Sequence, residues 1–278
     1  MYLLENGELQ AKIAQEPFEL ISLTKNGQEY IYQQNSSWKK SWPICFPIVG
    51  KLIDDQYWYR NQVYKMTGHG FFRSITKWEL LEHSATKLVV KYDGDDFLAI
   101  YPFRFCLKVT YELTTTGLIN TVEVINLSND DLPYNFGWHP AFKVNPNVGK
   151  VIFDQSSQVM EIPGGQFLGK ELVGEVLTEF DIKSHDFDQG QCYAVFGHKL
   201  TTVKIEDDLR ELEIVVKNYP NLLLWKVDNG AEFICVEPWD GHHDDYNFAT
   251  TPFDEKPWIN HLKRQENKTY QLVITIKK

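Results

Sequence analysis

Apolar and polar side chains alternate with a period of two through much of this chain. The alternation is longest at residues 105–113, where every second side chain from Phe105 to Leu113 is apolar, and at residues 270–277 near the C-terminus. Shorter stretches repeat it at residues 121–125, 202–205, 211–216 and 222–227. Because successive side chains of a strand point to opposite faces of its sheet, this pattern predicts a series of amphipathic β-strands.

Polar turn signals separate these stretches, whereas helical periodicity is scarce. The clearest turn signals are Asp93-Gly94-Asp95, Asn129-Asp130-Asp131, Pro163-Gly164-Gly165 and Asp228-Asn229-Gly230. Many short strands between polar turns are typical of a β-sandwich or barrel. No linker, low-complexity run or internal repeat divides the chain, so we expect one all-β domain over residues 1–278.

The charge balance narrows the range of partners. Lys and Arg number 28 against 38 Asp and Glu, which gives a net charge of −10. This excess of acidic residues argues against binding to nucleic acid or to an anionic membrane. The chain also has no segment resembling a signal peptide and no apolar run long enough to span a membrane. A cytoplasmic protein is therefore expected.

The cysteines give no sign of a metal centre. Cys45, Cys106, Cys192 and Cys235 lie far apart and form no C-x-x-C motif, so neither a disulfide framework nor a zinc site is indicated. Three of the four lie in apolar, strand-like runs, where a free cysteine packs as a small hydrophobic side chain. No Gly-rich phosphate loop follows a predicted strand. We therefore expect neither a metal nor a cofactor.

One predicted strand carries a carboxylate where an apolar side chain would be usual. In residues 233–241 the alternation places Glu237 on the same face as Phe233 and Cys235, and Pro238 is expected to end the pairing. A glutamate at the end of a half-buried strand is unfavourable unless it is paired or has a chemical role. A salt-bridged or surface glutamate is the ordinary interpretation, and other segments must support a functional one.

Two further segments place histidines beside glycines. In Gly68-His69-Gly70-Phe71-Phe72-Arg73, flanking glycines allow a tight backbone path that can hold His69 toward a cleft. A turn or core histidine is the alternative for His69, and a surface ion pair is the alternative for Arg73. In residues 134–142, an extended backbone would place His139 on the same side as Gly137, with open space in front of it.

Two other groupings are weaker. His242-His243-Asp244-Asp245 looks like a metal cluster, but adjacent residues on extended backbone point apart, so we expect a solvated loop. A glycosidase would need a second carboxylate beside Glu237, and the sequence nominates none. No Gly-x-Ser-x-Gly spacing supports a catalytic triad.

Together these segments resemble the aldose 1-epimerase (mutarotase) superfamily, and in particular its LacX-like branch, which is related to the hexose-6-phosphate 1-epimerases. The resemblance runs from about residue 41 to about residue 259 in the order of the family. It rests on Ser41 to Gly50, His69-Gly70-Phe71-Phe72-Arg73, Tyr101-Pro102-Phe103-Arg104-Phe105, Gly137-Trp138-His139-Pro140-Ala141-Phe142 and Glu237-Pro238-Trp239-Asp240-Gly241. It implies a large antiparallel β-sandwich with a substrate cleft over the concave sheet face.

The resemblance also implies roles for individual residues. Glu237 matches the family's general base, His139 its general acid, and His69 the histidine that orients the sugar near the ring oxygen. Four further residues are candidates for substrate binding, although they match the family less closely or could instead have a packing role. They are Arg73, Lys51, Trp239 and Asp244. At Lys51 many relatives carry arginine, so a bidentate contact is lost there.

The resemblance therefore predicts an enzyme that interconverts the α and β anomers of an aldohexose by acid–base ring opening. A hexose-6-phosphate 1-epimerase and a non-catalytic sugar-binding protein of the same fold remain as alternatives. The expected partner is a small sugar.

Overall fold

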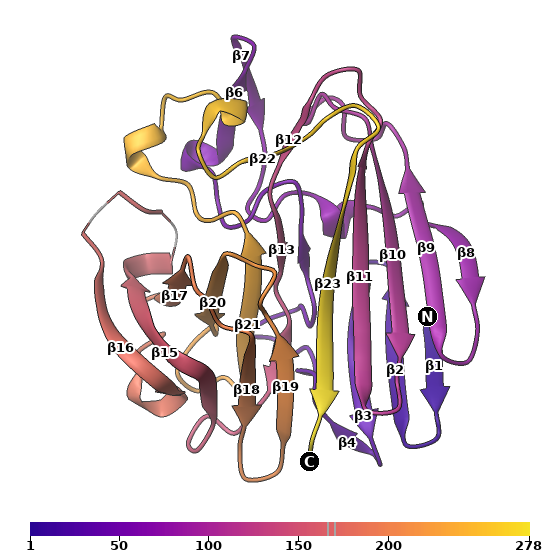
Figure 1. Ribbon diagram of the computed structural model, residues 1–278, viewed down its shortest axis with the longest axis vertical. Coiled ribbons are helices and arrows are strands. Elements are labelled where there is room, and N and C mark those ends of the chain that lie inside the picture. Colours follow the sequence, from indigo (N-terminus) through magenta and orange to yellow (C-terminus); the bar gives the residue numbers. More distant parts are fainter. Residues whose placement is uncertain (166, 170) are drawn as a thin grey trace.

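The computed structural model describes residues 1–165, 167–169 and 171–278. Their regular elements are β-strands and short 3₁₀ helices, which confirms the prediction of an all-β chain. The strands pair antiparallel, and most of them join one large sheet, while the N-terminus forms a smaller sheet beside it (Figure 1). None of the described helices is long and apolar enough to cross a membrane.

The large sheet divides at its longest strand, β15 (Lys150–Ile162), because the start of β15 pairs with β18 (Thr202–Glu206) and its end with β17 (Cys192–Phe196). One half carries, in pairing order, β5 (Ile44–Cys45), β13 (Phe136–Trp138), β21 (Phe233–Asp240), β20 (Asn221–Trp225) and β17 (Cys192–Phe196), with β14 (Ala141–Lys143) on β21 and β16 (Val173–Asp181) on β15. The other half carries β18 (Thr202–Glu206), β19 (Glu211–Val215), β23 (Asn267–Ile276), β11 (Gly117–Asn126), β10 (Phe105–Leu113), β9 (Lys87–Asp93) and β8 (Glu79–His83). The longest predicted strands, at residues 105–113 and 270–277, correspond to β10 and β23.

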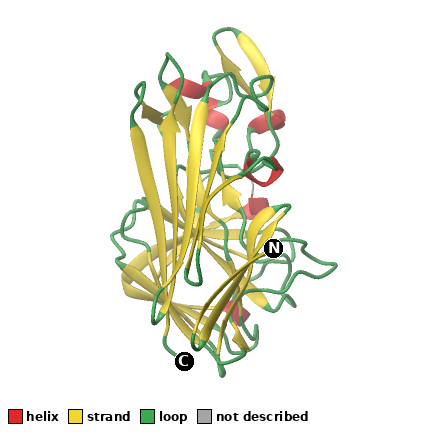
Figure 2. Ribbon diagram, turned by 90° about the vertical axis from the view of Figure 1, so that its right-hand side faces the viewer, coloured by secondary structure: helices red, strands yellow, loops and turns green. Residues whose placement is uncertain are grey.

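The two halves pack face to face around the main core, which confirms the expected sandwich (Figure 2). Phe136 of β13 stacks on Tyr270 of β23, with ring centroids 4.1 Å apart. The indole of Trp138 is fully buried in the same layer and donates a hydrogen bond to the hydroxyl of Tyr219. Burial of such large aromatic surfaces is a major favourable term in the stability of the sandwich.

Strand β21 has one face in this core and the other turned away from it. Ile234 and Val236 pack in the main core, whereas Cys235 lies on the opposite face near Glu237. The predicted shared face of Cys235 and Glu237 is therefore confirmed. Glu237 is buried all the same, with 2% of its surface exposed.

The prediction that Pro238 ends the pairing of this strand is wrong. Pro238 pairs with Leu222, and β21 continues to Asp240. The backbone N–H of Val236 points toward Pro140, so the missing N–H of Pro238, two residues further along, faces the same side. On that side His139 and Pro140 separate β13 from β14, so the proline lies beside a break in the neighbouring strand.

The remaining elements surround the large sheet. The N-terminal sheet consists of β1 (Tyr2–Asn6), β2 (Leu9–Gln15), β3 (Phe18–Lys25) and β4 (Gln28–Glu29) and contacts β9 and β10. Two small pairs are formed by β6 (Gln56–Tyr59) with β7 (Gln62–Lys65), and by β12 (Leu132–Tyr134) with β22 (Asn260–Leu262). The 3₁₀ helices are η1 (Ile53–Asp55), η2 (Phe72–Ser74), η3 (Pro163–Gly165), η4 (Ile182–Ser184), η5 (Tyr246–Phe248) and η6 (Phe253–Glu255).

Candidate functional site

A cleft of about 340 Å³ lies over the outer face of β21, β20 and β17. Its size is at the lower end of the range for small-molecule sites, which suits a ligand of one ring. The floor comes from the strands and the walls from loops around residues 38–40, 50–51, 68–69, 164–165, 190 and 243. Its lining includes the predicted site residues Glu237, His139, His69, Trp239 and Lys51.

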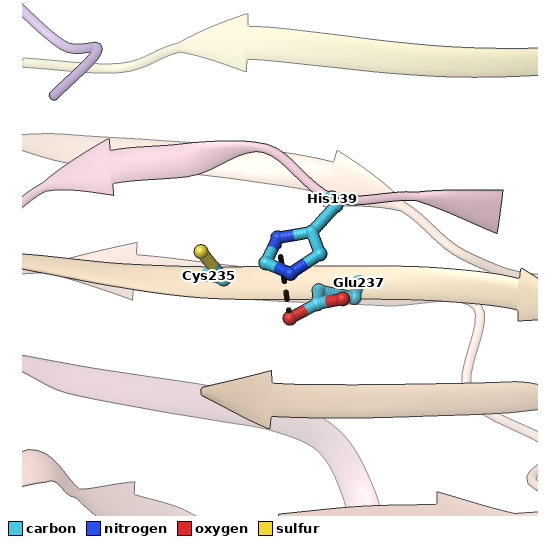
Figure 3. A group of neighbouring side chains, drawn as sticks. All are labelled: His139, Cys235 and Glu237. Carbon is cyan, nitrogen blue, oxygen red and sulfur yellow. Dashed lines mark ion pairs between the residues drawn. The ribbon is translucent and has the colours of Figure 1, made fainter. Parts of the chain in front are cut away.

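Glu237 and His139 meet on this floor (Figure 3). Nδ1 of His139 lies 3.5 Å from Oε1 of Glu237, and 7% of the histidine's surface is exposed. His139 occupies the break between β13 and β14, where its backbone N–H donates to the carbonyl of Pro43. The strand register thus brings together two groups that can exchange a proton.

Burial shifts the pKa values of this pair in opposite directions. Removal from water raises the pKa of Glu237 well above its usual range, and the Trp239 indole and the Lys40 ammonium oppose that shift. Burial also lowers the pKa of His139 well below its usual range, and nearby His69 and Lys40 add to this effect. Burial therefore disfavours the charged form of both groups.

Gly137 allows Trp239 to lie across the floor of the cleft. A Cβ atom at Gly137 would lie 2.5 Å from Cδ1 of Trp239 and 2.8 Å from Cγ1 of Val49. The sequence pattern predicts open space in front of this glycine, but the indole of Trp239 fills it. The indole N–H donates to the carbonyl of Trp138, which fixes the ring beside Glu237.

His69 reaches the cleft from a strained turn. Its φ of +62° is followed by +71° at Gly70, where a Cβ atom would lie 2.1 Å from the carbonyl oxygen of Phe46. Nδ1 of His69 accepts from the backbone N–H of Gly50 at 3.3 Å and lies 3.2 Å from Sγ of Cys45. Because Nδ1 is an acceptor, the proton of the neutral ring belongs on Nε2.

The His69 ring is neutral at physiological pH. Burial lowers its pKa to about 3, and the positive charges of Lys40 and Lys51 contribute in the same direction. The ring packs edge-on against His139, with centroids 5.0 Å apart. A neutral His69 can therefore offer its Nε2–H as a hydrogen-bond donor beside the His139–Glu237 pair.

Sequence reasoning missed several residues that line the cleft: Trp38, Lys40, Cys192, Leu223, Trp225 and His243. Trp38 stacks on His139 with ring centroids 5.4 Å apart, and Trp225 meets the same imidazole edge-on. Two aromatic walls and a tryptophan floor suit the apolar C–H face of a sugar ring. For Trp38 and Lys40 the sequence does contain a signal, because Trp38-Lys39-Lys40-Ser41-Trp42 is a basic and aromatic run in an acidic chain.

Arg73, expected among the substrate-binding residues, does not line the cleft in this structure and is engaged in an ion pair instead. Its Nε and Nη2 donate to Oε2 of Glu19 at 3.1 and 2.7 Å. Glu19 is fully buried, and its other oxygen accepts from the backbone N–H groups of Ser41 and Trp42. Through Glu19, Arg73 thus helps to fix the segment that carries Lys40.

Asp244 is also outside the cleft lining. Its carboxylate binds the ammonium of Lys256 at 2.5 Å and accepts from the backbone N–H of Ile53, and both ionic side chains are almost fully buried. The neighbouring His243 is 2% exposed and packs against Trp239 on the wall of the cleft. The predicted solvated loop at residues 242–245 is therefore wrong, because a buried ion pair draws it into the protein.

Comparisons with known proteins agree with this architecture. A family model described as aldose 1-epimerase matches residues 1–249. The chain is 30% identical over 244 residues to the plasmid form of protein LacX from Lactococcus lactis subsp. lactis, covering 78% of this chain and 79% of LacX. Its structure is similar to that of a galactose mutarotase related enzyme from Lactobacillus acidophilus (TM-score 0.88, 21% identity, 100% and 97% covered). A galactose mutarotase-like protein from Lactobacillus casei is also similar (TM-score 0.82, 24% identity, both chains fully covered).

Proposed function

Because the chain belongs to the aldose 1-epimerase family, we propose that it interconverts the α and β anomers of an aldohexose in this cleft. The observation that carries the proposal is the buried pair of Glu237 and His139, 3.5 Å apart on the floor of a cavity for one ring. A protein that only binds sugar would not need a carboxylate and an imidazole buried together, because burying such groups is unfavourable.

The reaction needs two proton transfers between oxygen atoms. Glu237 takes the proton of the C1 hydroxyl while His139 gives a proton to the ring oxygen, so that the C1–O bond of the ring breaks and an aldehyde forms. Rotation about the C1–C2 bond turns the aldehyde, and the reverse transfers close the ring on its other face. Each positioned acid or base typically contributes about 10²–10⁴-fold to the rate.

The chemistry requires one proton on the buried pair of Glu237 and His139. A neutral carboxyl with a neutral imidazole, and a carboxylate with an imidazolium, differ only in where that proton lies. The second arrangement is the reactive one, since it contains both a base and an acid. Sugar hydroxyls that bind to Glu237, together with the positive charge of Lys40, favour the carboxylate form.

The proposal is tested by measuring anomer exchange, by polarimetry or NMR, with chelator-treated protein and a panel of aldohexoses. Glu237→Gln keeps the shape of the side chain and removes the base, so kcat should fall by about 10²-fold or more with binding largely retained. Glu123→Gln on β11, outside the cleft, is the matched control and should retain normal activity. Exchange at the buffer rate for every sugar would refute the enzyme and favour a sugar-binding protein.

A hexose 6-phosphate is the second candidate substrate, and two lysines favour it. Lys40 and Lys51 line the cleft, and neither has a carboxylate partner among the described residues. We place the neutral hexose first because an ammonium lacks the bidentate fork of arginine and Glu19 already holds Arg73. A kcat/KM at least tenfold higher for the 6-phosphate, lost in Lys40→Met, would reverse this order.

A further inference from the structure

Cys235 lies beside the two proposed catalytic groups and has no part in the reaction described above. Figure 3 shows its sulfur and the Glu237 carboxylate on β21, with the His139 imidazole reaching toward this strand from the neighbouring segment. One ligand atom from each of the three residues lies within 4.8 Å of the other two. All three side chains are buried, with at most 7% of the surface of any residue exposed.

Two polar atoms of this group have no hydrogen-bond partner among the described residues. They are Nδ1 of His139 and Oε2 of Glu237, and both are shielded from solvent. A buried polar atom without a partner destabilises a protein, because it has lost its hydrogen bonds to water, so such atoms call for an explanation. Both are potential metal ligands, and the third member of the group offers a thiol.

The spacing of these atoms suits a tetrahedral ion. Zn–N and Zn–O bonds of about 2.0–2.2 Å place two ligand atoms roughly 3.3–3.5 Å apart at a tetrahedral centre. Nδ1 of His139 and Oε1 of Glu237 are already 3.5 Å apart. A Zn–S bond near 2.3 Å places the sulfur roughly 3.5 Å from the other two ligand atoms, so from a separation of at most 4.8 Å the thiol needs to approach by no more than about 1.3 Å. The fourth position would face the cleft.

We propose that Zn²⁺, or another ion that prefers thiolate and imidazole ligands, binds to His139, Cys235 and Glu237 and stops anomer exchange. Binding requires Cys235 to lose its thiol proton and Glu237 to be a carboxylate, while His139 binds as the neutral ring. An ion in this place occupies the lone pairs that remove and return the proton of the sugar. Only the inhibitory part rests on the proposed function; the binding site itself does not depend on it.

Binding is tested without any substrate. Chelator-treated protein is titrated with Co²⁺, which gives a thiolate-to-metal charge-transfer band when a cysteine is a ligand. The band should appear in the natural protein, disappear in Cys235→Ser and persist in Cys106→Ser, whose cysteine is buried on β10 in the other half of the large sheet. Absence of the band from the natural protein, or its persistence in Cys235→Ser, would overturn the proposal.

Cys192→Ser decides against a rival ligand pair in the same cleft. Sγ of Cys192 lies 3.9 Å from Nε2 of His243, so an ion could instead bind there. Loss of the band in Cys192→Ser and not in Cys235→Ser would assign the ion to that pair and refute the site proposed here. Circular dichroism of each variant shows whether it is folded, and Glu237→Gln, which removes a different ligand, should weaken Co²⁺ binding independently of Cys235.

Inhibition is tested with the exchange assay. Zn²⁺ should slow anomer exchange reversibly, with activity restored by a chelator, and sugar should compete with the ion. Cys235→Ala should need on the order of tenfold more Zn²⁺ for the same inhibition while Cys106→Ala is unchanged. Cobalt binding at Cys235 without any measurable exchange would leave the ion site standing and remove the proposed function, whereas exchange insensitive to Zn²⁺ would refute the inhibition.

Discussion

Replacing Arg73 by alanine tests whether this residue stabilises the cleft from outside or binds substrate. Arg73 contacts Oε2 of Glu19 through two nitrogens, and Glu19 is fully buried on β3. The other oxygen of Glu19 binds the backbone of Ser41 and Trp42, next to Lys40. Arg73→Ala therefore removes the only cationic partner of this carboxylate among the described residues.

The expected loss of stability can be estimated from these contacts. Removing one partner of a buried ion pair typically lowers the free energy of unfolding by about 3–5 kcal/mol, because the other charge stays buried. The side chain of Arg73 is itself 28% exposed, so water can replace part of its contribution. We therefore expect a loss near the lower end, about 3 kcal/mol, or roughly 6 °C in Tm for a chain of this length.

Urea unfolding followed by tryptophan fluorescence measures this loss, and anomer-exchange kinetics on the same samples measure the effect on function. Arg73→Lys keeps the charge but not the two-pronged contact, so it should lose less stability than Arg73→Ala. The double variant Glu19→Gln/Arg73→Ala should be more stable than the sum of the single effects predicts. Unchanged unfolding in Arg73→Ala, together with a KM raised tenfold or more, would refute the structural role and restore Arg73 as a substrate ligand.

Two further predictions concern the floor and wall of the cleft. Gly137→Ala should push the indole of Trp239 aside, which lowers kcat/KM and destabilises the fold by about 1–3 kcal/mol. The control Gly230→Ala, at a turn where an added Cβ atom meets nothing closer than 3.4 Å, should change neither quantity. Normal kinetics and stability in Gly137→Ala would contradict this packing argument. Burial lowers the pKa of His243 to about 3. In the unfolded chain this imidazole binds a proton with a pKa near 6.5, whereas in the folded protein it stays neutral down to about pH 3. The free energy of unfolding therefore falls as the pH drops from about 6.5 toward 3. Between about pH 7.5 and 5 this fall should be about 2 kcal/mol smaller in His243→Gln than in the natural protein. An equal fall in both proteins would contradict a neutral, buried His243.

The errors of sequence interpretation have physical causes. The sequence predicts that Pro238 ends a strand because proline lacks an N–H, but the missing donor faces a break in the neighbouring strand, where no donor is required. The polar residues of the His242–Asp245 run predict a solvated loop, but Lys256 neutralises Asp244 inside the protein. Trp38 and Lys40 were missed because nothing in their own segment shows that it folds over the cleft.

The sequence by itself determined the strands and the face on which Glu237 lies, because the period of two follows from local backbone geometry. It also determined the family, through motifs that occur in the expected order. Only the tertiary structure decided which charges are paired, what fills the space beside Gly137, and that Cys235 lies within reach of His139 and Glu237. Arg73 and its partner Glu19 are 54 residues apart, and side-chain spacing carries no information about contacts of that kind. They arise from how the sheets and loops pack, where burial and electrostatic pairing are settled together.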